Sequence, residues 1–216
     1  MNLLITSYCL ITESKVVVND QLHFYQENFL NFANFIKSIY KQEEINYPKF
    51  YKMDSLSKLG FLSSELVLKA SNISRYREEE VGVIMMNSSS SLDTDIVHQD
   101  SIKDSSNYFP SPSVFVYTLP NILIGEICIK NKIKGENAFL ISETFDAELI
   151  RSCVENLMRE ERLKACLCGW VELLGEKFES LLVWVEKAGS TENQAETVFR
   201  PLPFTEETLK QLLHRN

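Results

Sequence analysis

The cysteines are the most reactive side chains of this 216-residue chain, and two of them lie close together. Cys166 and Cys168 are two residues apart in the run ACLCGW, so on a strand both would point to one face. Thiolates can bind metals or attack carbonyls, but no second pair of cysteines or histidines completes a metal site. We therefore expect no metal and no cofactor, and we interpret the pair as small core residues. Cys9, Cys128 and Cys153 bring the total to an odd five among apolar neighbours, which does not indicate disulfides.

Hydroxyl and imidazole groups could together form a nucleophile and its base. The run Ser88–Ser91 has no evident base nearby, and its polarity is typical of a solvated loop. His23, His98 and His214 are far apart in the sequence, and each is expected at the surface. These residues alone predict no catalytic pair.

Short apolar runs bounded by polar or turn residues predict the strands that would position any site. Most of these runs are almost continuously apolar, which is typical of a sheet covered on both faces. An α/β fold with helices on both sides of the sheet is expected. The predicted strands are Leu3–Leu10, Val81–Asn87, Ala138–Ser142, Ala165–Leu173 and Ser180–Lys187.

Between these strands, apolar residues at three- and four-residue spacing predict helices. Asp54 and Thr205 can each cap the first turn of a helix, and Thr118 is placed to do so before Pro120. The predicted helices are Gln26–Lys41, Asp54–Lys69, Pro120–Lys130, Ala147–Leu163 and a carboxy-terminal helix over Thr205–Asn216.

Composition limits the class of protein. Apolar residues make up 44% of the chain, which is enough for one core, so we expect a single domain over residues 1–216. A distributed net charge of −8 argues against binding to nucleic acid. The apolar amino-terminal stretch is too short to span a membrane and follows no basic segment, so a cytoplasmic protein is expected.

Several local phrases, in order, resemble the amino-terminal half of β-ketoacyl-acyl-carrier-protein synthases, the thiolase-like condensing enzymes. This resemblance implies a five-stranded mixed sheet in the order 3-2-1-4-5, covered by helices on both faces. It extends along most of the chain. The phrases are Lys52-Met53-Asp54, Val81-Gly82-Val83-Ile84, Leu119-Pro120-Asn121, Lys134-Gly135-Glu136-Asn137 and Gly175-Glu176.

The same resemblance puts Thr144 where the family carries its catalytic cysteine. A threonine hydroxyl has a far higher pKa than a thiol and needs an adjacent base. The family's second half, with its catalytic histidines, has no counterpart in the remaining residues. No catalytic residue is therefore expected.

The leading hypothesis is a non-catalytic subunit similar to the chain-length factors of polyketide, aryl-polyene or fatty-acid-type pathways. It would pair with a ketosynthase, or with itself as a dimer. The family pairs subunits along the nucleophile strand, so the resemblance implies an interface that includes Ala138, Phe139, Ile141 and Phe145. A missing sister half would also leave one apolar face to be covered, by the carboxy-terminal helix or by a partner.

Two alternatives stay open. One is an acyl-transfer or hydrolytic enzyme with an altered nucleophile, using Ser142, Thr144 or Asp146; Glu143 is a poor base because neighbours on a strand face opposite ways. The other is a module that binds an acyl chain or an acyl carrier protein. Its basic contact would be Lys130, Lys132 and Lys134, although such lysines are equally typical of a solvated helix end.

Overall fold

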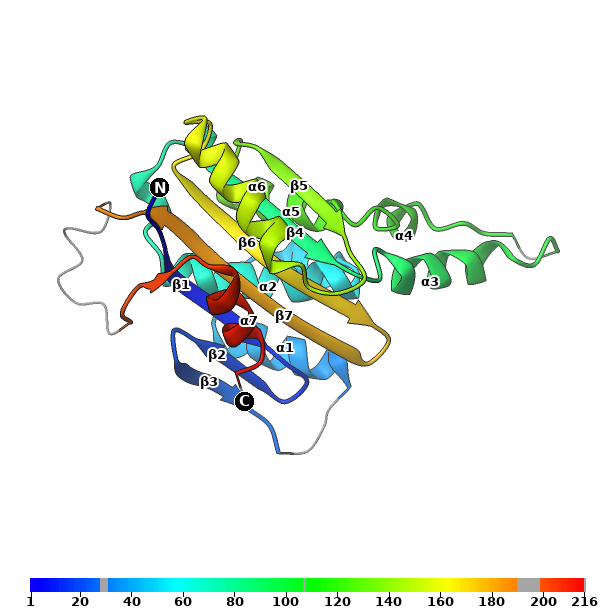
Figure 1. The fold of residues 1–216 in the computed structure, drawn as a ribbon. Helices are drawn as coiled ribbons and strands as arrows, with labels where there is room; N and C mark the ends of the chain where they lie inside the picture. Colours follow the sequence, from blue (N-terminus) through cyan, green and yellow to red (C-terminus); the bar gives the residue numbers. More distant parts are fainter. Residues whose placement is uncertain (28–30, 107, 190–198, 216) are drawn as a thin grey trace.

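The computed structural model describes residues 1–27, 31–106, 108–189 and 199–215, and these form a three-layer α/β arrangement (Figure 1). One eight-stranded sheet lies in the middle, in the order β3-β2-β1-β7-β6-β4-β5, and β8 pairs with β1. Its strands are β1 (Leu3–Ile11), β2 (Lys15–Val18), β3 (Gln21–Tyr25), β4 (Val81–Asn87), β5 (Asn137–Ile141), β6 (Ala165–Leu174), β7 (Lys177–Lys187) and β8 (Leu202–Pro203).

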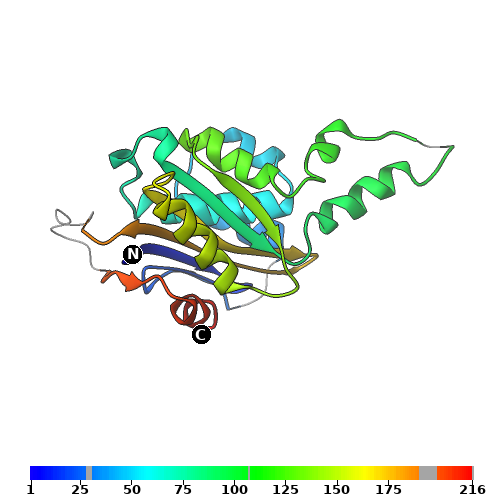
Figure 2. The same cartoon turned by 45° about the horizontal axis from the view of Figure 1, so that its top comes forward.

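Helices cover both faces of this sheet, as the sequence predicts (Figure 2). The first face carries α1 (Phe32–Gln42), α2 (Ser55–Lys69) and α5 (Ile122–Asn131), and the second face carries α6 (Ala147–Arg159) and α7 (Glu206–Leu213). Two further helices, α3 (Leu92–Ile102) and α4 (Pro112–Val116), project beyond the sheet. Three 3-10 turns complete the chain: η1 (Pro48–Lys52), η2 (Ile73–Arg75) and η3 (Glu78–Glu80).

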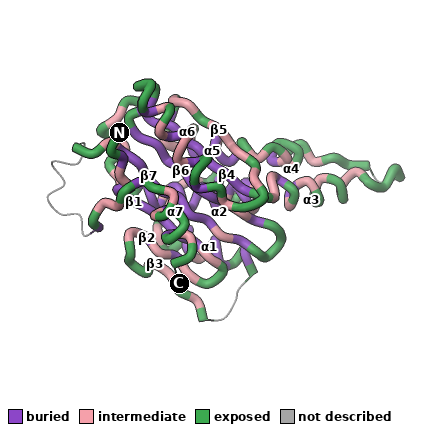
Figure 3. Tube along the Cα trace, in the orientation of Figure 1, coloured by how far each residue is buried: buried purple, intermediate pink, exposed green. Residues whose placement is uncertain are grey.

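Two apolar cores result, one on each side of the sheet. Strand side chains alternate between them, so Phe35, Leu62 and Trp184 lie in the core under α1, α2 and α5. Ile150 and Leu209 lie in the core under α6 and α7. The central strands β4, β6 and β7 are buried along almost their whole length, which explains their continuous apolar runs (Figure 3).

Parallel and antiparallel pairing are mixed. β4 pairs in parallel with both β5 and β6, whereas β7 runs antiparallel to β6 and β1. The five predicted strands therefore stand in the order 3-2-4-5-1, and the expected order 3-2-1-4-5 is wrong. The physical reason is local: β6 and β7 are joined by a tight turn and form a hairpin, and β4 occupies the other side of β6. The first strand pairs with the other side of β7 and not with β4.

The expected count of five strands is also wrong, because a hairpin of β2 and β3 extends the sheet beyond β1. Its turn uses Asn19 and Asp20 in left-handed conformations, the usual residue types for a two-residue hairpin. The run KVVVNDQLHFY contains this signal, with β-branched residues before the turn. Sequence analysis did not use it.

Helix boundaries follow the caps. Asp54 and Thr205 cap α2 and α7 as predicted, with side-chain oxygens that accept from Ser57 N and Thr208 N. Thr118 does not cap α5; its hydroxyl donates to the carbonyl of Phe115, and the helix begins after Asn121. The helix predicted to reach Leu163 ends at Arg159. Residues 28–30 and 216, within two other predicted helices, lie outside the described residues.

Candidate functional site

The carboxyl ends of the parallel strands β4, β5 and β6 lie together at one end of the sheet. Open parallel sheets bind their ligands at the carboxyl ends of their strands, so this is where chemistry would be expected. Three segments converge there: the turn Ser88–Ser91 after β4, the bend Ser142–Asp146 after β5, and the end of β6 near Glu172. The backbone N–H of Ser142 donates to the carbonyl of Asn87 at 3.0 Å, which ties the first two segments together.

Thr144 lies in the bend between β5 and α6, exposed to solvent. Asp146 ends this bend and caps α6, since its Oδ1 accepts from Leu149 N at 2.9 Å. Its carboxylate is thereby committed to a structural hydrogen bond. Glu143 is exposed beside Thr144, and no hydrogen bond between the two side chains is recorded in the described part of the chain.

The histidines are placed elsewhere. His23 lies on β3 and approaches Glu43 at 3.3 Å, and His98 lies on α3 against the ring of Phe115. His214 follows α7. Across the described ranges, no recorded hydrogen bond joins a histidine to Ser142, Thr144 or Asp146, so these residues do not form a nucleophile with a base.

The serine turn is held by its neighbours rather than open for binding. Glu172 Oε2 accepts the backbone N–H groups of Ser88 and Ser89, at 2.7 and 3.1 Å. Asn87 accepts from Ser90 N at 3.0 Å and donates to Ser90 O at 2.8 Å. These donors are already used, so they are not free to stabilise an oxyanion. Sequence analysis predicted the loop but missed the bracing roles of Asn87 and Glu172; polar residues at the ends of apolar strands were the available signal.

Cys166 and Cys168 do point to one face of β6, both fully buried in the core under α6. Burial is the main reason that the pKa of Cys168 lies well above its usual value, and the hydrogen bond with Cys166 raises it further. Burial likewise raises the pKa of Cys9 to about 12. Such thiols are neutral and shielded, which fits packing rather than nucleophilic attack.

The three predicted carrier-contact lysines lie around the opposite end of β5, where the strand begins. Lys134 pairs with Glu78 at 2.6 Å and Lys130 with Glu65 at 3.8 Å. Lys132 sits at the end of α5 in a left-handed conformation. Acidic partners thus offset much of the positive charge, and the contact with an acyl carrier protein stays a prediction.

β5 forms one outer edge of the sheet, because within the described residues no strand pairs with its far side. Ser142 N bonds to β4, and alternate residues of a strand bond to the same side. The backbone N–H groups of Phe139 and Ile141 therefore face outward. The edge strand has neither a charged residue nor a proline, the usual protections against pairing with another chain.

The predicted interface residues divide between the two faces of β5. Phe139 packs, partly buried, on the α2 and α5 side, whereas Ala138 and Phe145 pack on the α6 side. Ile141 is 52% exposed at the end of the strand. Ala138, Phe139 and Ile141 lie on this edge strand, with Ile141 the most accessible, whereas Phe145 follows the strand and its ring centroid lies 5.9 Å from that of Trp170 on β6.

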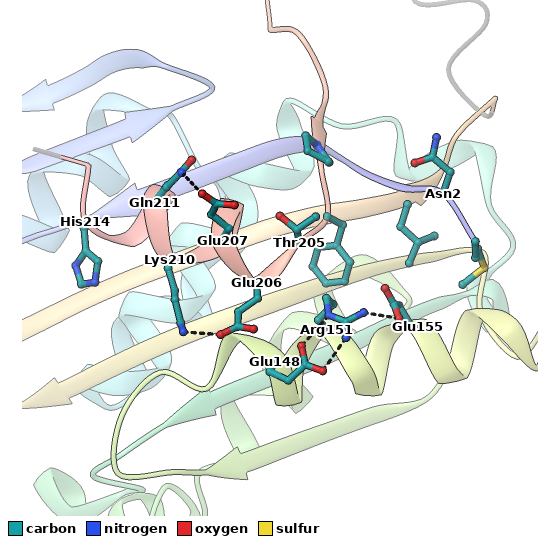
Figure 4. Close-up of a pocket in the computed structure, with 14 residues that line it drawn as sticks. Asn2, Glu148, Arg151, Glu155, Thr205, Glu206, Glu207, Lys210, Gln211 and His214 are labelled. Atoms are coloured by element: carbon teal, nitrogen blue, oxygen red, sulfur yellow. Dashed lines mark hydrogen bonds and ion pairs between the residues drawn. The ribbon is translucent and has the colours of Figure 1, made fainter.

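The second face of the sheet is covered by the chain itself. Leu209 and Leu212 of α7 are buried against the sheet, so the carboxy-terminal helix does fold back over this face. Between α6 and α7 lies an open groove of about 990 Å³ (Figure 4). Arg151 in its wall pairs with Glu148 and Glu155, both at 2.6 Å, and Lys210 pairs with Glu206 at 2.5 Å. The outer surface of α6 is therefore polar and internally paired.

Comparison by sequence finds no match to any family model or to any curated protein. Comparison by structure finds three informative similarities. The ishigamide ketosynthase/chain length factor has a TM-score of 0.65 at 16% identity, over 89% of this chain and 64% of that one. A ketosynthase complex with the acyl carrier protein of a type II polyketide synthase gives 0.64 at 14%, over 90% and 65%.

The third is a ketosynthase in complex with its chain length factor from Xenorhabdus doucetiae, with a TM-score of 0.54 at 11% identity, over 88% and 81%. This chain spans less than two thirds of the first two structures. Within the described residues, no helix is both long and apolar enough to cross a membrane. The chain shares the thiolase-like fold of ketosynthases and chain length factors.

Proposed function

We propose that this protein is a non-catalytic, chain-length-factor-like subunit that pairs with a ketosynthase in fatty-acid, polyketide or aryl-polyene-type biosynthesis. The observation that carries the proposal is the setting of Thr144. It lies exposed in the bend after β5, and within the described residues no recorded hydrogen bond joins its side chain to a base. A thioester-attacking hydroxyl needs such a base.

Two further observations support pairing. The outward amides of Phe139 and Ile141 can extend the sheet into a second chain, and Ile141 adds an exposed apolar side chain beside them. Two of the similar structures are described as a ketosynthase with a chain length factor.

The first test is the solution mass of the purified chain, alone and mixed with the ketosynthase encoded beside it. We expect a stable mixed complex. Ile141→Asp should weaken it at least about tenfold, because pairing would bury an unpaired carboxylate. Leu22→Asp is the matched control, since Leu22 is 62% exposed on the opposite edge strand β3. A chain that ignores the ketosynthase would contradict the proposal.

The second test separates a scaffold from an enzyme. The chain is incubated with an activated acyl thioester and examined by intact-mass and peptide mass spectrometry. No acyl group should be attached, and Thr144→Ala should leave the output of the mixed complex unchanged. An adduct on Ser142 or Thr144 that disappears in Thr144→Ala would instead identify an enzyme with an altered nucleophile.

A further inference from the structure

The segment from Leu92 to Leu119, here called the arm, projects past the carboxyl ends of β4 and β5 (Figures 1 and 2). It consists of α3, α4 and the connection between them, of which residue 107 is not described. Among its described residues only Thr94 and Tyr117 are buried. Figure 3 shows the same contrast between the exposed arm and the buried sheet.

The arm nevertheless has a fixed base. Thr94 Oγ1 donates to Asp54 Oδ2 at 2.8 Å, and Tyr117 OH donates to the buried Glu126 at 3.0 Å. Asp93 accepts from Gly175 N, in the turn between β6 and β7, at 3.0 Å. These buried or long-range bonds orient the arm, so it is a positioned element of the fold.

Beyond its base, the arm exposes a group of large apolar side chains. Exposed apolar surfaces of this kind mark binding sites. Ordering a segment costs conformational entropy, and apolar side chains that stay in water contribute no burial free energy to offset that cost. Phe115 packs against the ring of His98, with centroids 5.4 Å apart, and is still 60% exposed. The group comprises Leu92 (45%), Ile96 (51%), Val97 (53%), Phe115 (60%), Val116 (48%) and Leu119 (56%).

The size of a stable protein interface indicates that β5 needs a further contact surface such as this one. A stable protein interface takes about 800 Å² and some 20–30 residues from each partner, but β5 has 5 residues. The edge strand alone is too small. The arm begins five residues after Asn87, whose carbonyl bonds to Ser142 N just after β5, so the arm leaves the sheet beside the end of that edge strand.

We infer that the arm is the second half of the partner-binding surface and docks on the ketosynthase that pairs along β5; this rests on the proposed function. The charge of the arm indicates which charge the facing surface of the partner should carry. α3 carries Asp93, Asp95 and Asp100, and within the described residues only Asp100 is paired with a lysine, Lys103 at the end of the helix, at 2.7 Å, so the arm keeps a net negative charge there. The facing surface of the ketosynthase is therefore an apolar depression bordered by lysine or arginine side chains.

The test compares Phe115→Asp with Leu22→Asp, because the two parent side chains are almost equally exposed, at 60% and 62%. Each variant is first shown to keep the urea midpoint of the natural protein. Its dissociation constant with the ketosynthase is then measured by calorimetry. Phe115→Asp should weaken the complex at least about tenfold, whereas Leu22→Asp should leave it unchanged.

Hydrogen exchange supplies an independent readout. Amides of residues 92–102 and 112–116 should exchange more slowly in the complex than in the free chain. If the natural protein binds the ketosynthase but Phe115→Asp binds equally well and the arm gains no protection, the inference is wrong while the proposed function stands. If the natural protein does not bind, both are wrong. Protection of the arm by self-association alone would assign the surface to a second copy and overturn the ketosynthase as its occupant.

Discussion

The two edges of the sheet, β5 and β3, differ in how far the chain satisfies them by itself. β3 belongs to a hairpin with a register shift between Val16 and Val17, and such irregularities disfavour pairing with another strand. Gln42 of α1 also donates to the carbonyl of His23 on β3 at 2.8 Å. β5 pairs with β4 in regular register and has no such irregularity. Within the described residues, the protein therefore protects the β3 edge and leaves the β5 edge unpaired.

The largest expected effect on stability comes from a substitution in the interior of the sheet. Gly169 on β6 has a φ of 147°, and an added Cβ would collide with the carbonyl oxygen of Leu181. Gly169→Ala should therefore lower the free energy of unfolding by about 2–5 kcal/mol. Gly125→Ala is the matched control: it meets nothing within 4 Å on α5 and should raise stability by about 0.5–1 kcal/mol. Urea unfolding measures both, and equal effects would refute the steric account.

Proline substitutions can test the direction of the β5 amides. Leu140 N faces β4, so Leu140→Pro removes a ladder hydrogen bond and should destabilise the chain by about 3 kcal/mol. Ile141→Pro removes an outward N–H and should cost less, while abolishing pairing with the ketosynthase. Thermal unfolding and solution mass distinguish them. Should Ile141→Pro pair normally, the β5 edge is not the interface.

Removing a hydrogen bond from the protected β3 edge should make it more like the unpaired β5 edge. Gln42→Ala removes the hydrogen bond to the His23 carbonyl. We expect a loss of about 0.5–1 kcal/mol, because water replaces much of an exposed bond. Unfolding in urea gives this number, and Gln99→Ala on α3, also exposed, is a control that should have no effect on it.

The smallest effect concerns pH at the β3 edge. Partial burial would raise the pKa of Glu43, but hydrogen bonds from Lys69 and His23 outweigh it and hold that pKa below its usual value. In the window between this lowered pKa and the ordinary value, the unfolded chain binds more protons, so stability falls as pH falls. The loss should stay under about 1 kcal/mol, as for solvent-screened ion pairs. Glu43→Gln should remove this part of the pH dependence in urea titrations; an unchanged slope would contradict the assignment.

Sequence patterns located β1, β4, β6 and β7 within a few residues, because a run buried on both faces is apolar throughout. β5 was also located, from a short apolar run, although it is a half-exposed edge strand. The helix α3 was missed for the opposite reason: LDTDIVHQDSI buries only Thr94 and has no continuous apolar side. An element whose apolar side chains face solvent leaves no core-directed period to read. Ser142 was expected at the end of the strand, whereas β5 ends at Ile141 and Ser142 lies in the bend with Thr144. The bracing of the serine turn by Glu172 was not predicted, because Glu172 lies more than 80 positions along the chain from Ser88 and Ser89.

By itself, the sequence determined the α/β class and the positions of the buried strands and of the helices that pack on them, since each depends on residue type and local spacing. Only the tertiary structure decided the strand order, the protected and open edges, and the projection of the arm. These depend on pairings between segments far apart in the sequence: β7 pairs with β6, β1 joins the other side of β7, and β5 is left as the edge.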